Sequence, residues 1–92
     1  MNPTQSSVFI RSLGVYTPER KMTNDDLSKI VDTNDEWIKT RSGIAERRIA
    51  GPTENPSDMG AKACAQALKN AGLKAEDIDL LIVATMTPDV PF

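Results

Sequence analysis

Three side chains that could together bind a flat, anionic ligand lie at helical spacing near the middle of the chain. Trp37, the only tryptophan, and Arg41 are four residues apart, so on a helix they share one face. Thr33 lies one turn earlier on that face. An indole can stack on a nucleobase, and a guanidinium can bind a ring face or a phosphate. These residues therefore form a candidate nucleotide site.

The same residue types also admit a purely structural interpretation. Large aromatic side chains usually serve packing, and an arginine on the same helix face can cover an indole as a cation–π partner. From residue types alone, this packing interpretation is the favoured one.

A short helix is predicted to position these side chains, and both of its ends are encoded. Thr33 is expected to be the N-cap, with Glu36 completing a capping box. Acidic residues occupy the first turn and basic residues the last, as the helix dipole favours. Gly43 stands where a left-handed C-cap is wanted.

The rest of the chain predicts an α/β order of elements. The pattern indicates a strand over 7–16 with a bulge near 12–14, a capped helix over 23–31, a short strand over 44–50, a helix over 57–71 capped by Ser57, and a strand over 78–85. Residues 80–84 are apolar without alternation, which is typical of a strand buried on both faces of a parallel sheet. The order is that of a βαβ unit with a right-handed crossover. Because such a sheet needs helices on both faces, we expect further chain beyond residue 92.

Cys64, the only cysteine, lies on the inner stripe of the long predicted helix. We expect it to be a buried, small apolar side chain, since a nucleophile needs an adjacent base and a polar setting. The chain contains no histidine, so it offers neither a histidine base nor a histidine metal ligand. We therefore assign no catalytic residue and no metal site to residues 1–92.

Composition narrows the class of protein. With 11 basic and 13 acidic residues the formal net charge is −2, which argues against nucleic-acid binding through a basic surface. One thiol fits a reducing cytoplasm, and we recognise no signal peptide and no apolar run long enough to cross a bilayer. We expect a cytoplasmic protein that binds neither nucleic acid nor membrane.

Several sequence blocks, taken together in their order along the chain, are more specific. They are 13–19 (LGVYTPE), 23–27 (TNDDL), 31–38 (VDTNDEWI), 40–44 (TRSGI), 46–50 (ERRIA), 71–73 (AGL), 77–80 (DIDL) and 83–89 (VATMTPD). Together they resemble the N-terminus of β-ketoacyl-acyl-carrier-protein synthase III, a thiolase-fold enzyme that starts bacterial type II fatty-acid synthesis. The resemblance runs from about residue 8 to the end of the chain.

The resemblance implies a fold and an activity. Residues 1–92 would be an N-terminal fragment of the first thiolase-like half, the βαβ portion of a layered α-β-α-β-α fold. Such acyltransferases condense a short acyl-CoA primer, of the acetyl-CoA type, with malonyl-carrier protein. Their catalytic cysteine, histidine and asparagine would all lie beyond residue 92, so the fragment alone should be inactive. The resemblance further implies coenzyme A as a substrate thioester rather than a cofactor, an acyl carrier protein as partner, and a homodimer.

The resemblance also assigns binding residues. Thr33, Trp37 and Arg41 match positions that hold the adenine end of coenzyme A at the tunnel mouth, which makes the ligand-binding interpretation the favoured one. Trp37 would stack on the base, Thr33 would hydrogen-bond it, and Arg41 would pack on it or meet phosphate. Phe92 matches a residue that reaches across the dimer to the other subunit's acyl pocket and shapes primer choice. It could equally be an ordinary apolar loop residue.

One position departs from the family pattern, and two other functions stay open. Such proteins often carry arginine where this chain has Ala45. Lys39, Arg47 and Arg48 could supply the positive field instead, or form a solvated basic edge. The alternatives are a related thiolase-fold condensing enzyme of secondary metabolism and a non-catalytic protein that binds a nucleotide or a partner.

Overall fold

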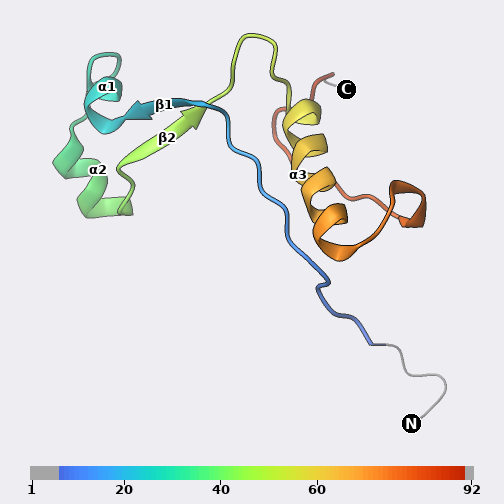
Figure 1. Ribbon diagram of the computed structural model, residues 1–92. Helices are drawn as coiled ribbons and strands as arrows, with labels where there is room; N and C mark the ends of the chain where they lie inside the picture. Colours follow the sequence, from blue (N-terminus) through green and yellow to red (C-terminus); the bar gives the residue numbers. More distant parts are fainter. Residues whose placement is uncertain (1–6, 91–92) are drawn as a thin grey trace.

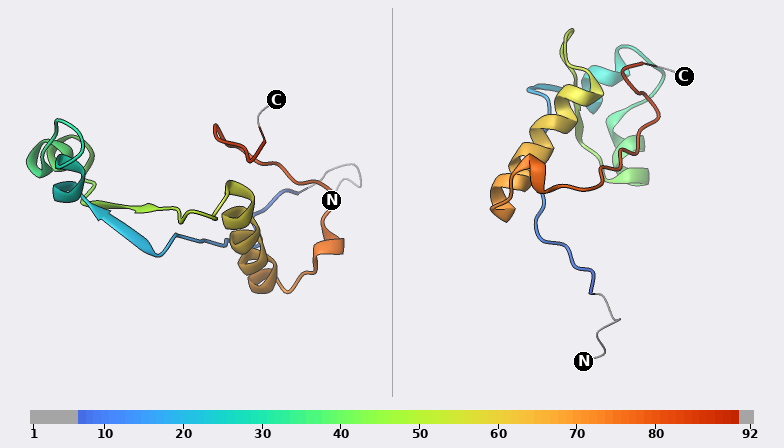
Figure 2. Two further views of the ribbon diagram at one scale, coloured as in Figure 1. Left: turned by 90° about the horizontal axis from the view of Figure 1, so that it is seen from above. Right: turned by 90° about the vertical axis from the view of Figure 1, so that its right-hand side faces the viewer.

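The computed structural model describes residues 7–90 of the 92-residue chain. Its elements follow the order β1 (Arg20–Thr23), α1 (Asn24–Ser28), α2 (Asp35–Ser42), β2 (Glu46–Ile49), α3 (Pro56–Ala71) and a 3₁₀ turn (Ala75–Asp77). Figure 1 shows β1, β2, α1 and α2 gathered at one end of the molecule and α3 at the other. The molecule is elongated, with principal extents of 59 × 32 × 28 Å (Figure 2).

The two strands form an antiparallel hairpin whose connection is the pair of short helices. Arg20 pairs with Ile49 at one end of the ladder and Thr23 with Glu46 at the other. The strand predicted over 44–50 is confirmed as β2. The sequence did not predict β1, because its residues are mostly charged or polar and do not alternate. It becomes a strand by pairing with β2.

The start of α1 was predicted correctly. The Thr23 side chain accepts a hydrogen bond from the N–H of Asp26, and the Asp26 carboxylate accepts one from the N–H of Thr23. The helix ends at Ser28, earlier than predicted, and two backbone hydrogen bonds to the Leu27 carbonyl lead the chain out of it.

Helix α3 begins one residue before the predicted start. Its N-cap is Asn55 rather than Ser57, and the N–H of Asn55 donates to the Asp58 carboxylate at 2.9 Å. Pro56 occupies the first helical position, where its missing N–H has no intrahelical partner to lose. The helix ends at Ala71, as predicted, and Gly72 follows it as a left-handed C-cap (φ 69°).

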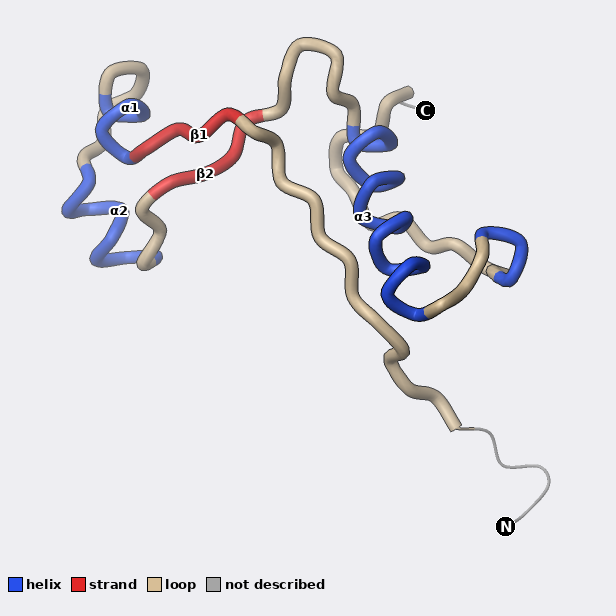
Figure 3. The backbone as a smooth tube through the Cα atoms, viewed as in Figure 1, coloured by secondary structure: helices blue, strands red, loops and turns tan. Residues whose placement is uncertain are grey.

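The segments 7–16 and 78–85, both predicted as strands, are extended but form no strand ladder within residues 7–90 (Figure 3). A strand needs a neighbour to accept its N–H groups, and no backbone hydrogen bond joins 7–16 to 78–85 in the described part. Residues 80–84, predicted to be buried on both faces, are exposed instead: Leu80 is 76% and Ile82 80% accessible. The βαβ order of segments is kept, but the parallel pairing is not formed in this chain.

Burial is sparse. Among the described residues, Ile38 at 9% exposure is the one buried apolar side chain and Asn24 at 1% the one buried polar side chain. Both lie in the part of the molecule formed by the hairpin and the two short helices. Within residues 7–90 we find no helix with the length and apolar character that crossing a bilayer demands.

Candidate functional site

Helix α2 carries the predicted binding residues, and its N-cap differs from the predicted one. The side chain of Asn34, not Thr33, accepts a hydrogen bond from the N–H of Trp37 at 2.8 Å. Thr33 lies one residue too early for this geometry, and its own N–H donates to the Val31 carbonyl. The predicted capping box between Thr33 and Glu36 is therefore wrong.

The other end of α2 and its shared face agree with the prediction. Gly43 is left-handed (φ 73°) and its N–H donates to the Lys39 carbonyl at 2.8 Å. The guanidinium carbon of Arg41 lies 4.7 Å from the centroid of the Trp37 ring. Trp37 is 55% exposed, so the indole is not a core side chain here. Thr33 is half-buried just before the cap.

A buried asparagine connects both ends of α2 to the hairpin. The Asn24 amide nitrogen donates to Asp35 Oδ1 and to the Ile44 carbonyl, each at 2.8 Å. Its Oδ1 accepts a hydrogen bond from Arg47 Nη2 at 2.7 Å. Sequence reasoning did not single out Asn24, because its burial depends on residues 11 to 23 positions away. Its place beside the capping residue Thr23 was the one local signal.

The Asp35 carboxylate has a depressed pKa. The Asn24 amide hydrogen bond is the largest cause, and the ammonium of Lys39, 3.1 Å away, adds to it. Asp35 is therefore ionised at neutral pH in the first turn of α2, where negative charge is favoured.

The cations near this face are mostly engaged in internal contacts. Arg47 is half-buried and also donates to the Met22 carbonyl at 3.3 Å. Arg48 donates to the Pro18 carbonyl at 2.8 Å, and Lys39 pairs with Asp35. Lys39, Arg47 and Arg48 were the predicted sources of the positive charge that is missing at Ala45. In the structure they also hold the hairpin and α2 in place.

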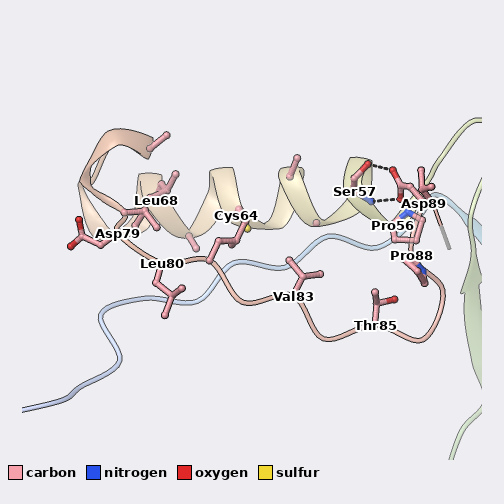
Figure 4. Close-up of a pocket in the computed structure, with 17 residues that line it drawn as sticks. Pro56, Ser57, Cys64, Leu68, Asp79, Leu80, Val83, Thr85, Pro88 and Asp89 are labelled. Carbon is pink, nitrogen blue, oxygen red and sulfur yellow. Dashed lines mark hydrogen bonds between the residues drawn. The ribbon is translucent and has the colours of Figure 1, made fainter. Parts of the chain in front are cut away.

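Away from α2, a groove lies between α3 and residues 75–90, with a volume of about 1050 Å³ (Figure 4). The helix contributes small residues, including Gly60, Ala61 and Cys64, and the extended segment contributes Leu80 and Val83. Cys64, predicted to be buried, is instead exposed on this groove, because no side chain of residues 7–90 packs over it.

At the start of α3, two hydrogen bonds between Ser57 and Asp89 join the helix to the extended segment. The N–H of Ser57 donates to Asp89 Oδ1 at 3.0 Å, and its hydroxyl donates to Oδ2. These bonds lower the pKa of Asp89. The remaining predicted site residue, Phe92, lies outside the described residues.

Comparison with known proteins gives the site its context. A β-ketoacyl-[acyl-carrier-protein] synthase III from Bacillus anthracis is 56% identical over 86 residues, covering 94% of this chain and 28% of that protein. One from Caldanaerobacter subterraneus is 55% identical over 83 residues, covering 90% and 25%. This chain is a homologue of part of β-ketoacyl-[acyl-carrier-protein] synthase III. No family model matches it.

Solved structures agree in fold. The 3-oxoacyl-[acyl-carrier-protein] synthase III from Aquifex aeolicus superposes with a TM-score of 0.82 at 52% identity, covering 90% of this chain and 27% of that one. The priming β-ketosynthase of a polyketide biosynthetic pathway gives 0.82 at 42% identity, covering 88% and 24%. The predicted class, part of a thiolase-like α/β fold, is thus confirmed. The chain spans about a quarter of the length of these synthase III relatives.

Proposed function

We propose that the complete protein carrying this chain is a ketosynthase III that starts type II fatty-acid synthesis. It would condense a short acyl-CoA primer with malonyl-carrier protein. The support is the 56% identity to a synthase III over nearly all of this chain. As the resemblance implies, we place the catalytic cysteine, histidine and asparagine elsewhere in the complete protein and assign a binding role to this segment, which has no histidine among its 92 residues.

The face of α2 is proposed to hold the adenine end of coenzyme A at the tunnel mouth. The observation that carries this assignment is the exposed indole of Trp37 with the Arg41 guanidinium 4.7 Å from its centroid. Adenine stacks on the accessible indole, while Arg41 adds a cation that favours both the ring and a nearby phosphate. Thr33, one residue before the cap, donates its hydroxyl to the base.

Further roles follow from the same proposal. Phe92 reaches the acyl pocket of a second subunit in a homodimer and shapes primer choice. Arg48 and Lys39, both exposed, contribute positive potential toward the acyl carrier protein. The protein acts in the cytoplasm.

A second candidate is a condensing enzyme of secondary metabolism. It is favoured by the likeness to a priming β-ketosynthase from a polyketide pathway at 42% identity. The two candidates differ in primer and product, so the rates with acetyl-CoA and with longer or branched acyl-CoA primers separate them.

The test compares two primers in the complete enzyme. Trp37→Ala should weaken the affinity for acetyl-CoA by about 1–3 kcal/mol, the usual contribution of base stacking. The matched control primer is acetyl-pantetheine, which carries the same thioester without adenine. The unaltered enzyme and the Trp37→Ala variant should use it equally well. An acetyl-CoA affinity unchanged by Trp37→Ala, or an equal loss with both primers, would overturn the adenine site. Absence of condensation by the unaltered enzyme would favour a non-catalytic binding protein.

A further inference from the structure

The helix that carries Trp37 and Arg41 has little apolar burial to fix its orientation. Helix α2 has eight residues, of which only Ile38 is buried. Short helices of this kind depend on tertiary contacts to persist. The contacts that hold α2 are therefore mainly polar, and Asn24 makes the buried ones.

Asn24 binds α2 at both ends with one amide group. Its nitrogen donates to Asp35, the first residue of the helix, and to the carbonyl of Ile44, the residue after the Gly43 C-cap. Its backbone N–H adds a hydrogen bond to the Ala45 carbonyl at 3.1 Å. A side chain that is 1% exposed thus links the first residue of the helix to the segment that follows its C-cap.

The orientation of this amide is itself fixed. Arg47 donates to Asn24 Oδ1, and an arginine has no acceptor, so the amide nitrogen must face α2. Both amide hydrogens and the oxygen are then paired, and within residues 7–90 no buried side-chain polar atom is left without a partner. A fully satisfied buried network of this kind specifies one arrangement.

We propose that Asn24 is a positioning residue for coenzyme A: it holds α2 so that Trp37 and Arg41 present one continuous surface to the adenine. This inference rests on the proposed function of that surface. Loss of the amide donors leaves the Asp35 carboxylate with Lys39 as its side-chain partner and leaves the Ile44 carbonyl without its Asn24 donor. The helix then reorients so that these oxygens reach water.

The test is a reciprocal exchange in the full chain. Asn24→Asp keeps the size of the side chain and the acceptor for Arg47, but it replaces both donated hydrogens with a carboxylate facing Asp35. Asp35→Asn is the matched control, because an amide oxygen still accepts from Asn24. The double variant restores one donor–acceptor pair in the reverse direction, so it should rescue the single Asn24→Asp variant.

Two readouts are used at neutral pH: the Kd for coenzyme A and the near-ultraviolet circular dichroism of Trp37. This is the only tryptophan of residues 1–92, and its signal is assigned by difference from Trp37→Phe. Asn24→Asp should raise the Kd about tenfold, as expected for charge-assisted hydrogen bonds lost from a buried site. It should also weaken the Trp37 signal. Asp35→Asn should stay within about threefold of the unaltered chain, and the double variant should recover most of the affinity and the signal.

The outcomes separate the two proposals. If Trp37→Ala loses coenzyme A but Asn24→Asp binds normally, the positioning role is overturned and the adenine site stands. If neither variant alters binding, the adenine site fails, and the Trp37 signal then decides alone whether Asn24 orients the helix. If Asn24→Asp unfolds, the double variant is compared directly with Asp35→Asn, and lack of rescue overturns the inference.

Discussion

Gly14 lies so close to α3 that a Cβ atom on it would stand 2.0 Å from the carbonyl oxygen of Ala63. The same atom would stand 2.6 Å from the backbone nitrogen of Ala67. The absence of a side chain lets the extended segment lie directly on the helix backbone. There the hydroxyl of Ser12 donates to the Ala67 carbonyl at 2.7 Å, and the N–H of Val15 donates to Gln66.

The first prediction concerns this close approach. Gly14→Ala should lower the free energy of unfolding by about 1–3 kcal/mol, because a rigid backbone oxygen blocks the new methyl group. Gly60→Ala is the matched control: the site lies within α3 with nothing inside 4 Å, so helix propensity should raise stability by about 0.5–1 kcal/mol. Urea unfolding of the two variants measures both effects. Equal free energies of unfolding for Gly14→Ala and Gly60→Ala would mean that residues 11–15 do not lie on α3.

The phenol of Tyr16 donates a hydrogen bond to Glu54 Oε2, and this contact joins the first extended segment to the loop before α3. Glu54 Oε1 also accepts from the N–H of Gly51 at 2.7 Å, and the Lys62 ammonium lies 4.7 Å from the Tyr16 ring centroid. The Glu54 hydrogen bond raises the pKa of Tyr16 above its ordinary value of 10.0. The same bond is the main cause that lowers the pKa of Glu54 below 4.5.

The second prediction follows from these opposite shifts. The pKa of Tyr16 is raised on folding, so its contribution to stability is full below pH 10.0 and is lost as the pH rises through the folded value. The contribution of Glu54 is present above pH 4.5 and is lost as the pH falls through its folded value. Glu54→Gln should therefore return the pKa of Tyr16 toward 10.0. Tyrosinate absorbance reports this, since Tyr16 is the only tyrosine of residues 1–92 and its titration step is assigned by difference from Tyr16→Phe. An unshifted titration would contradict the contact.

Some signals that act within one turn of chain were readable from the sequence, although the caps predicted at Thr33 and Ser57 were wrong. The reciprocal cap of Thr23 with Asp26, the left-handed Gly43 and Gly72, and the shared face of Trp37 and Arg41 all depend on neighbours within four residues. Each is decided by backbone geometry that a residue type either permits or forbids.

Features that depend on distant partners were not readable in this way. Strand β1 exists because β2 pairs with it, and Asn24 is buried by residues from α2 and β2. Conversely, residues 7–16 and 78–85 have strand-like sequence patterns. Such a pattern describes one strand and does not provide the neighbouring strand with which it must form hydrogen bonds. The apolar run 80–84 indicated that this segment needs apolar neighbours on both faces. It did not indicate whether residues 7–90 provide them. Binding by Thr33, Trp37 and Arg41 stays a prediction.

The third prediction separates capping from ligand binding at two adjacent residues. Asn34 and Thr33 are both good N-caps, and the sequence alone favoured Thr33 because Glu36 follows it at the capping-box distance. In the structure the Asn34 side chain accepts from the N–H of Trp37. Asn34→Ala should therefore lower the free energy of unfolding by about 0.5–2 kcal/mol, as loss of a cap does.

Thr33→Ala is the matched partner of that experiment. It removes no capping bond, so stability should change little, whereas the Kd for coenzyme A should rise because the proposed hydroxyl bond to adenine is lost. Trp37 fluorescence during urea unfolding gives the stability, and titration with coenzyme A gives the Kd. A stability loss confined to Thr33→Ala would restore it as the cap. A Kd that Thr33→Ala leaves unchanged would restrict the adenine site to Trp37 and Arg41.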